Sequence, residues 1–297
     1  EHHKILGPAI AKSYLGLVQR LPGLYDALHE SETLAEISQI WREVYRVFEG
    51  GRLRAKLEEL RPDLIVCTHA PALGALALEK VRGGLQTPLA AVITDFQAHP
   101  YWAAKGPDLF LTATKEAAAA LIGRGAAPKS VKATGIPLHP VFAKPVSQGS
   151  ARRALGLPEQ GLIALVTGGG RGLGRLADIT ELLLARPGLS VTAVCGSNHD
   201  TQAELRHKFA RERRVRVFGK LEPEFMREAM CASDFLVGKA GGLTSSECLA
   251  LGLPLVLFEP LAGQEERNAE FLVRGGAALR ADSLEELEKV LARLVRA

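Results

Sequence analysis

The sequence predicts an α/β protein built on parallel sheets. Short runs rich in Val, Ile and Leu recur along the chain, and Ala- and Leu-rich segments with helical spacing separate them. These runs lack the alternation of polar and apolar residues that marks a half-exposed strand, as expected for strands covered on both faces. Strands that alternate with helices indicate parallel neighbours joined by right-handed crossovers.

The expected strands form two groups on either side of a polar, proline-containing stretch at residues 144–150. They lie near 63–68, 89–94, 108–112 and 130–134 in the first half, and near 162–167, 190–195, 215–218, 234–238 and 254–258 in the second. A chain of 297 residues is long enough for two domains of ordinary size. We expect one domain at residues 1–145 and another at 146–297.

Composition excludes several classes of protein. The four cysteines, Cys67, Cys195, Cys231 and Cys248, lie among apolar neighbours without metal-ligand spacing, so we expect reduced thiols and no bound metal. No secretory signal and no run of about 18 apolar residues is present, which favours a cytoplasmic protein without a membrane span. The net charge of +4 is mild, and no nucleic-acid-binding motif accompanies it.

The glycine-rich turn at residues 238–247 is the most informative stretch of the chain. It follows the apolar run 234–238 and precedes a helical pattern that begins near Thr244. Gly241 and Gly242 let backbone amides at a helix start approach a phosphate closely. Glu247, one turn into the helix, could accept hydrogen bonds from neighbouring ribose hydroxyls. A plain helix cap uses the same residue types and is the alternative interpretation.

A second polar loop follows the next expected strand, 254–258. It carries Gln264, Glu265 and Asn268, whose amide and carboxylate groups suit the hydroxyls of a sugar. Ligands of open α/β sheets bind at the carboxyl ends of the strands. Two such loops on successive strands therefore favour a binding site over two solvated helix starts.

The two loops together resemble a known family. The residues that carry the resemblance are Gly241-Gly242-Leu243-Thr244-Ser245-Ser246-Glu247, Pro260-x-x-Gly263-Gln264-Glu265-x-x-Asn268-Ala269, the stretch 61–69, Thr94-Asp95-Phe96 with His99, and Gly135-Ile136-Pro137. They are similar to the diacylglycerol glycosyltransferases of the monogalactosyldiacylglycerol synthase type. They are also similar to the related enzyme that adds N-acetylglucosamine to the lipid-linked peptidoglycan precursor.

The resemblance implies the GT-B architecture, in which two Rossmann-like domains face an interdomain cleft. It places a UDP-sugar on the second domain and a lipid acceptor, at an anionic membrane surface, on the first. The family normally begins with a strand, a glycine-rich loop carrying a His, and a helix, and we expect this chain to lack them. Residues 5–28 are amphipathic, so they could lie on a membrane or pack on their own domain.

Further donor-site residues follow strands of the second half. The glycine loop after 162–167 resembles a dinucleotide fingerprint only weakly, because Leu173 stands where Gly or Ala is required. The family resemblance instead places Gly170 and Gly172 near the donor phosphates or the acceptor. It places Phe218 and Met226, with Gly196, around the uracil, although an apolar core explains Phe218 and Met226 equally well.

Transfer of a sugar to a hydroxyl requires a general base within hydrogen-bond reach of that hydroxyl. Asp95 follows the strand 89–94 and is the best candidate, with a helix N-cap as its alternative role. His99 lies four residues further on, and His69 follows the neighbouring strand. Either histidine could equally be a hydrogen-bonded structural residue.

The sequence therefore predicts an inverting glycosyltransferase that moves a hexose from a UDP-sugar to diacylglycerol, without a metal or other cofactor, while bound peripherally to a membrane. Three alternatives stay open: transfer of N-acetylglucosamine to a polyprenyl-linked precursor, a nucleotide-sugar-binding protein without activity, and a sugar-nucleotide 2-epimerase. A dinucleotide oxidoreductase fits least well, because the glycine fingerprint is incomplete.

Overall fold

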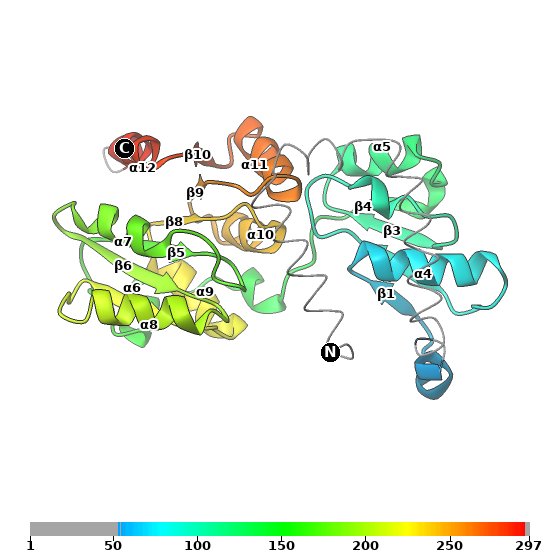
Figure 1. Cartoon of the computed structure of the whole chain (residues 1–297), viewed down its shortest axis with the longest axis horizontal. Coiled ribbons are helices and arrows are strands. Elements are labelled where there is room, and N and C mark those ends of the chain that lie inside the picture. The colour runs from blue at the N-terminus through cyan, green and yellow to red at the C-terminus, as the bar shows by residue number, and fades with distance from the viewer. Residues whose placement is uncertain (1–52, 54, 295–297) are drawn as a thin grey trace. The chain divides into compact units, whose positions relative to one another are not determined.

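The computed structural model describes residue 53 and residues 55–294 (Figure 1). Its contacts divide the chain into two compact units. The first contains the described residues up to Pro137 together with Leu261–Arg267, and the second contains Leu138–Pro260 and the residues from Asn268 onward. The predicted loss of a first strand, loop and helix, and the amphipathic stretch 5–28, lie outside the described residues.

The first unit contains a four-stranded parallel sheet in the order β1-β2-β3-β4. Its strands are β1 (Ile65–Cys67), β2 (Leu89–Val92), β3 (Leu109–Thr112) and β4 (Val131–Ala133). They are connected by α4 (Ala70–Val81), the 3-10 turns η1 (Pro100–Trp102) and η2 (Pro128–Ser130), and α5 (Lys115–Gly123). Each strand pairs with the next one in the chain, so every crossover moves the sheet in the same direction.

Helices α4 and α5 of this unit bury apolar side chains against the sheet. Leu73 of α4 and Leu121 of α5 join Leu89 and Phe110 in one buried cluster. The start of α5 is fixed locally, because the hydroxyl of Thr114 accepts a hydrogen bond from the Ala117 amide at 2.9 Å. A side-chain cap of this kind contributes roughly 1 kcal/mol to helix stability.

The second unit contains a six-stranded parallel sheet in the order β10-β9-β8-β5-β6-β7. Its strands are β5 (Leu162–Thr167), β6 (Leu189–Val194), β7 (Val215–Phe218), β8 (Phe235–Gly238), β9 (Leu255–Phe258) and β10 (Leu279–Ala281). The chain enters at β5 inside the sheet and moves outward through β6 and β7. It then returns to the other side of β5, where β8 pairs with it from Ala164↔Phe235 to Thr167↔Gly238.

Helices cover both faces of this second sheet. The helical elements after Pro137 are η3 (Pro140–Ala143), α6 (Gln148–Ala154), α7 (Leu176–Leu184), α8 (His199–Lys208), α9 (Pro223–Ala232), α10 (Gly242–Leu251), α11 (Gln264–Arg274) and α12 (Leu284–Leu294). All of them belong to the second unit except residues 264–267 of α11, which belong to the first. Helices α7, α8 and α12 share one buried cluster with Val166 of β5. Helices α6 and α9 pack with Ile163 in a second cluster. Successive residues of β5 thus point to opposite, equally apolar faces.

The strand predictions are confirmed, with one omission and small shifts of boundary. Each of the nine predicted runs overlaps an observed parallel strand, whereas β10 was not predicted. Helix α10 begins at Gly242 rather than near Thr244, and residues 148–150 of the expected linker belong to α6. All four cysteines are free thiols, as predicted, and three of them are buried.

Candidate functional site

The second sheet has a topological switch point between β5 and β8. The chain leaves the carboxyl end of β5 toward one side of the sheet and the carboxyl end of β8 toward the other. The two loops that follow these strands therefore diverge, and an open α/β sheet binds its ligand in the crevice that forms there. Those loops are residues 168–175 and 239–241, both of which carry glycines that the sequence analysis selected.

The start of α10 is open to an anion. Its N-cap residue is Gly241, which has no side chain with which to cap the first amides of the helix. Gly242 is buried, Leu243 is exposed, and Thr244 lies in the third helical position. The first amides of a helix have no partner within the helix, and together with the positive end of the helix dipole they favour a phosphate at this point.

Glu247 lies half-buried on α10, in the second turn of the helix. Its burial raises the pKa of the carboxyl group from an ordinary 4.5 to about 7. Burial has this effect because the charged form loses hydration without an equivalent replacement. The charged form of such a carboxylate is stabilised by any ligand that donates hydrogen bonds to it, as the two hydroxyls of a ribose can.

The glycine loop after β5 is closed onto the loop after β6. A Cβ on Gly172 would lie 1.9 Å from the Cys195 oxygen, and a Cβ on Gly196 would lie 2.4 Å from the Gly170 oxygen. The Ser197 amide donates to that Gly170 oxygen at 2.9 Å. Backbone packing therefore explains why Gly172 and Gly196 are glycines, whether or not a ligand approaches them. Gly170 is exposed and has no such neighbour.

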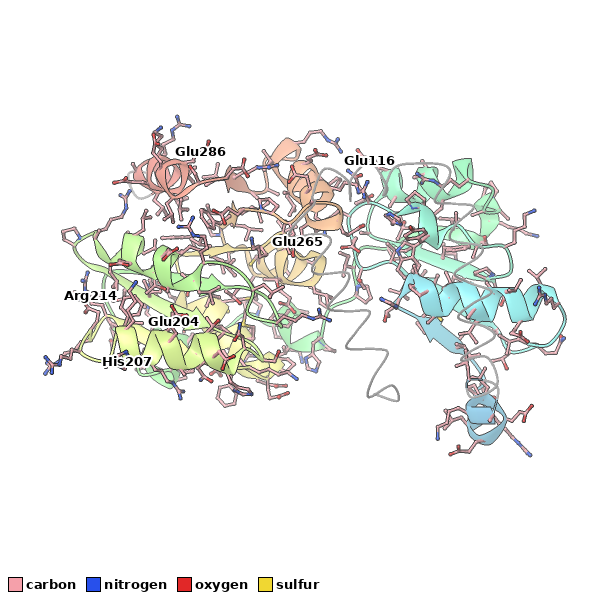
Figure 2. The ribbon with its side chains drawn as sticks, viewed as in Figure 1. Glu116, Glu204, His207, Arg214, Glu265 and Glu286 are labelled. Carbon is pink, nitrogen blue, oxygen red and sulfur yellow. The ribbon has the colours of Figure 1, made fainter. Side chains whose placement is uncertain are left out.

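The polar residues after β9 start helix α11. Gln264 is its first residue, and the Oε2 atom of Glu265 (Figure 2) accepts a hydrogen bond from the Leu261 amide at 2.9 Å. Asn268 is buried, and its Nδ2 atom donates to the Ala240 oxygen at 3.0 Å. Asn268 thus ties α11 to the loop after β8, which is a structural role that the sequence analysis did not predict.

Phe218 and Met226 lie on consecutive elements of the second unit. Phe218 ends β7 and Met226 belongs to α9, and both side chains are half-buried. The oxygen of Phe218 accepts the Cys195 amide at 2.9 Å, which continues the ladder between β6 and β7 into the loop that carries Gly196. Phe218 and Gly196 are thus at neighbouring strand ends.

The predicted catalytic residues belong to the first unit. His69 is exposed and precedes α4, and Asp95 is half-buried in the loop after β2. Because β1 and β2 are parallel neighbours, both residues leave the same edge of the sheet. His99 is buried, and its Nδ1 atom accepts the Tyr101 amide at 3.1 Å, so it caps the turn η1.

Two functional candidates were missed by the sequence analysis. Lys239 follows β8 directly, and its Nζ atom donates to the main-chain oxygen of Glu259, the first residue after β9. Glu259 has a φ of 44°, a left-handed value that is rare for a residue with a side chain. Lys239 could have been selected from the sequence, because it is a lysine at a strand end inside a glycine-rich run.

Within residues 53 and 55–294, no cluster of three or more His, Cys, Asp or Glu side chains could hold a metal ion. Among the helices of the same described residues, none is both long and apolar enough to cross a membrane.

Solved structures with the same architecture define the class of fold. MurG from Acinetobacter baumannii aligns with a TM-score of 0.55 at 18% identity, over 82% of this chain and 67% of that one. Anabaena HepE in complex with UDP and glucose gives 0.57 at 19%, over 82% and 72%. The UDP-GlcNAc 2-epimerase of Neisseria meningitidis bound to UDP-GlcNAc gives 0.61 at 14%, over 83% and 71%. The fold is thus the predicted one, two parallel-sheet Rossmann-like domains of the GT-B class.

Sequence comparison then identifies the family. Residues 1–138 match the model of monogalactosyldiacylglycerol (MGDG) synthase, and residues 163–297 match that of the glycosyltransferase family 28 C-terminal domain. The processive diacylglycerol beta-glucosyltransferases of Staphylococcus aureus strains Newman and COL are each 27% identical over 296 residues, which is 99% of this chain and 74% of theirs. The chain belongs to the glycosyltransferases that combine these two domains.

Proposed function

We propose that this protein transfers a hexose from a UDP-sugar to diacylglycerol and inverts the anomeric carbon. The observation that carries this proposal is the similarity to the Staphylococcus aureus diacylglycerol glucosyltransferases over 99% of the chain. Because that similarity includes the half that matches MGDG synthase, it supports the lipid acceptor as well as the donor. The proposed division of labour assigns the acceptor to residues 1–145 and the donor to residues 146–297.

In the donor half, the proposed site lies at the carboxyl ends of the strands of the second sheet. The amides of Gly241 and Gly242 bind the diphosphate, since they lie at the start of α10, where the helix dipole favours an anion. The carboxylate of Glu247 accepts hydrogen bonds from the ribose hydroxyls. Phe218 and Met226 enclose the uracil. Leu243, Thr244, Gly170 and Gly196 contact the nucleotide, and Gln264 with Glu265 and Asn268 recognises the sugar.

In the acceptor half, Asp95 is the proposed general base. The acceptor hydroxyl attacks the anomeric carbon, its proton passes to the Asp95 carboxylate, and the bond from that carbon to the diphosphate oxygen breaks. One direct displacement inverts the configuration. His69 and His99 support this site, His99 chiefly by shaping the turn that follows Asp95.

The proposed acceptor is a membrane lipid, so the protein is proposed to work peripherally on a membrane surface. An excess of positive charge, +4 for the chain, supports an anionic surface as the partner. Electrostatic attraction of this kind weakens as salt is added, because exposed charges are screened over about 10 Å at 0.1 M ionic strength.

Titration calorimetry with UDP, UDP-glucose, UDP-galactose, UDP-N-acetylglucosamine and NAD tests the proposal. We expect saturable binding of UDP and of one UDP-hexose. Glu247→Ala should weaken UDP binding, whereas Glu288→Ala, an exposed carboxylate on α12, should leave it unchanged. Binding of NAD without UDP would contradict a glycosyltransferase, and a clear preference for UDP-N-acetylglucosamine would favour the cell-wall precursor over diacylglycerol.

A further inference from the structure

The loop after β2, which carries the proposed general base, is held by a side chain from a distant part of the chain. The Nε2 atom of Gln264 donates a hydrogen bond to the main-chain oxygen of Gln97 at 3.1 Å, although 167 residues separate the two. Gln97 lies two residues after Asp95, and both glutamines belong to the first unit. A residue that the sequence analysis assigned to the sugar thus also contacts the backbone beside Asp95.

The chemistry of this contact fixes the orientation of the Gln264 amide. A main-chain oxygen can only accept a hydrogen bond, so the nitrogen of the amide must face Gln97. The Oε1 atom of Gln264 accepts no hydrogen bond from the residues that the structure describes. It therefore remains able to accept one from a hydroxyl group of a sugar.

A second side chain holds the preceding peptide group of the same loop. The hydroxyl of Thr114, which also accepts from the Ala117 amide at the start of α5, donates to the main-chain oxygen of Phe96 at 2.9 Å. Two successive carbonyl groups, those of Phe96 and Gln97, are therefore bound by side chains of different elements. Because the peptide groups that follow Asp95 are fixed in this way, the direction of the Asp95 side chain depends on both bonds.

Gln264 is itself held in place at the start of α11. Gly263, the residue before it, has a left-handed φ of 87°, which lets the chain turn into the helix. The Leu261 amide donates to Oε2 of Glu265 at 2.9 Å. The Arg267 amide donates to the Gly263 oxygen at 3.3 Å. Gln264 therefore extends from a backbone that is fixed on both sides.

We infer that Gln264 is a positioning residue for Asp95: its amide nitrogen orients the loop of the general base, and its amide oxygen accepts a hydrogen bond from the transferred sugar. This inference rests on the proposed function. In the transfer step, the acceptor oxygen bonds to the anomeric carbon, the bond from that carbon to the diphosphate breaks with its electron pair on the phosphate oxygen, and the proton goes to Asp95. Gln264 moves no proton. It acts through geometry, since a misplacement of about 1 Å near the reacting atoms lowers a rate about a hundredfold.

The test uses two substitutions at position 264 and a matched control. Gln264→Glu keeps the size of the side chain and an acceptor oxygen but removes the N–H donor, and Gln264→Met removes both without adding a charge. A carboxylate in the first turn of a helix is favoured by the helix dipole, so Gln264→Glu should fold. The control is Gln86→Glu, because Nε2 of Gln86 also donates to a main-chain oxygen, that of Gly83 at 3.0 Å, outside the loop of Asp95.

Transfer rates at saturating UDP-hexose, together with calorimetry of the same UDP-hexose, separate the two roles of the amide. We expect both variants at position 264 to lower kcat by about ten- to a hundredfold. Gln264→Met should also weaken UDP-hexose binding, whereas Gln264→Glu should weaken it less, because an acceptor oxygen remains. UDP binding itself should be unchanged in both, and Gln86→Glu should behave as the wild type.

A double-mutant cycle shows whether the loss of rate passes through Asp95. In the Asp95→Asn background, Gln264→Glu should lower kcat less than about twofold, because the residue that it positions no longer takes the proton. Equal losses in the two backgrounds, a loss of UDP-hexose affinity alone, or an unchanged kcat would each overturn the inference and leave the proposed function intact. A wild type that binds UDP-hexose but transfers no sugar would overturn the proposed function, and the inference with it.

Discussion

The main-chain oxygen of Cys195 lies only 1.9 Å from the point where a Cβ on residue 172 would be. Gly172 also has a left-handed φ of 58°, so two separate constraints require glycine at this position. This contact joins the loop after β5 to the loop after β6, and with it one edge of the candidate donor site. Gly172 is therefore required by the packing of this loop, and a ligand would contact only those atoms of the loop that the packing leaves exposed.

Gly172→Ala should destabilise the protein by about 3 kcal/mol or more, because the new methyl group overlaps a backbone atom and the backbone strain is added to that overlap. Gly170→Ala is the matched control two residues away. Its Cβ would meet no atom within 4 Å, and its φ is not left-handed. We expect a change below about 0.5 kcal/mol there. Urea unfolding of the two variants measures both values, and equal stabilities would contradict the packing described.

Glu247 should make the stability of the protein depend on pH. Its pKa is about 7 in the folded state and near 4.5 when solvated, so between these values the folded state binds more protons than the unfolded state. Stability therefore falls as pH rises through this window. Glu247→Gln removes this dependence. The gain in free energy of unfolding of Glu247→Gln over the wild type should therefore be absent at pH 4 and largest above pH 7.

Urea unfolding of the wild type and Glu247→Gln from pH 4 to pH 8 measures this difference, and groups common to both proteins cancel. A difference that is constant over the whole range would show that burial does not perturb the Glu247 carboxyl.

Glu259 allows the strain of a left-handed backbone to be measured. Glu259→Ala and Glu259→Gly both remove the contact with Arg175, but only glycine adopts a φ of 44° without steric cost. We expect Glu259→Gly to be more stable than Glu259→Ala by about 1 kcal/mol. Thermal unfolding of the pair decides the matter. A more stable alanine variant would mean that position 259 does not keep this backbone conformation in solution.

Asp95→Asn should separate chemistry from donor binding. The substitution keeps the shape of the side chain but removes its ability to take a proton, so transfer should fall by about 10²- to 10⁴-fold. UDP affinity should be unchanged, because the residues proposed to bind the diphosphate and the ribose, Gly241, Gly242 and Glu247, belong to the other unit. Rates of sugar transfer and UDP calorimetry on one preparation give both quantities. A variant with wild-type rates would exclude Asp95 as the base.

Local residue pattern was sufficient to locate most strands, because a strand buried on both faces is a continuous apolar run. Strand β10 was missed because Leu279–Ala281 is short and contains a charged residue, Arg280. Its conformation depends on pairing with β9 at the edge of the sheet. Pairing between distant segments has no local signature, so the order of strands followed only from the structure.

The same limit applies to the candidate site. The sequence placed Gly241, Gly242 and Glu247 at a strand-to-helix turn because glycine and the helical pattern are local features. It gave no role to Lys239, whose acceptor Glu259 lies twenty residues further along the chain. It also gave Asn268 no structural role, whereas the structure shows its Nδ2 atom donating to the Ala240 oxygen. Contacts between loops of different strands decide such roles.

A direct assay of sugar transfer is the most direct test of the proposed function. The whole chain would be incubated with vesicles of diacylglycerol and phosphatidylglycerol and with labelled UDP-glucose, UDP-galactose or UDP-N-acetylglucosamine, and the lipids analysed by mass spectrometry. We predict a hexosyl-diacylglycerol with one of the two hexose donors, and its loss in Asp95→Asn. No labelled diacylglycerol with any donor, from a protein that binds UDP, would contradict the central claim.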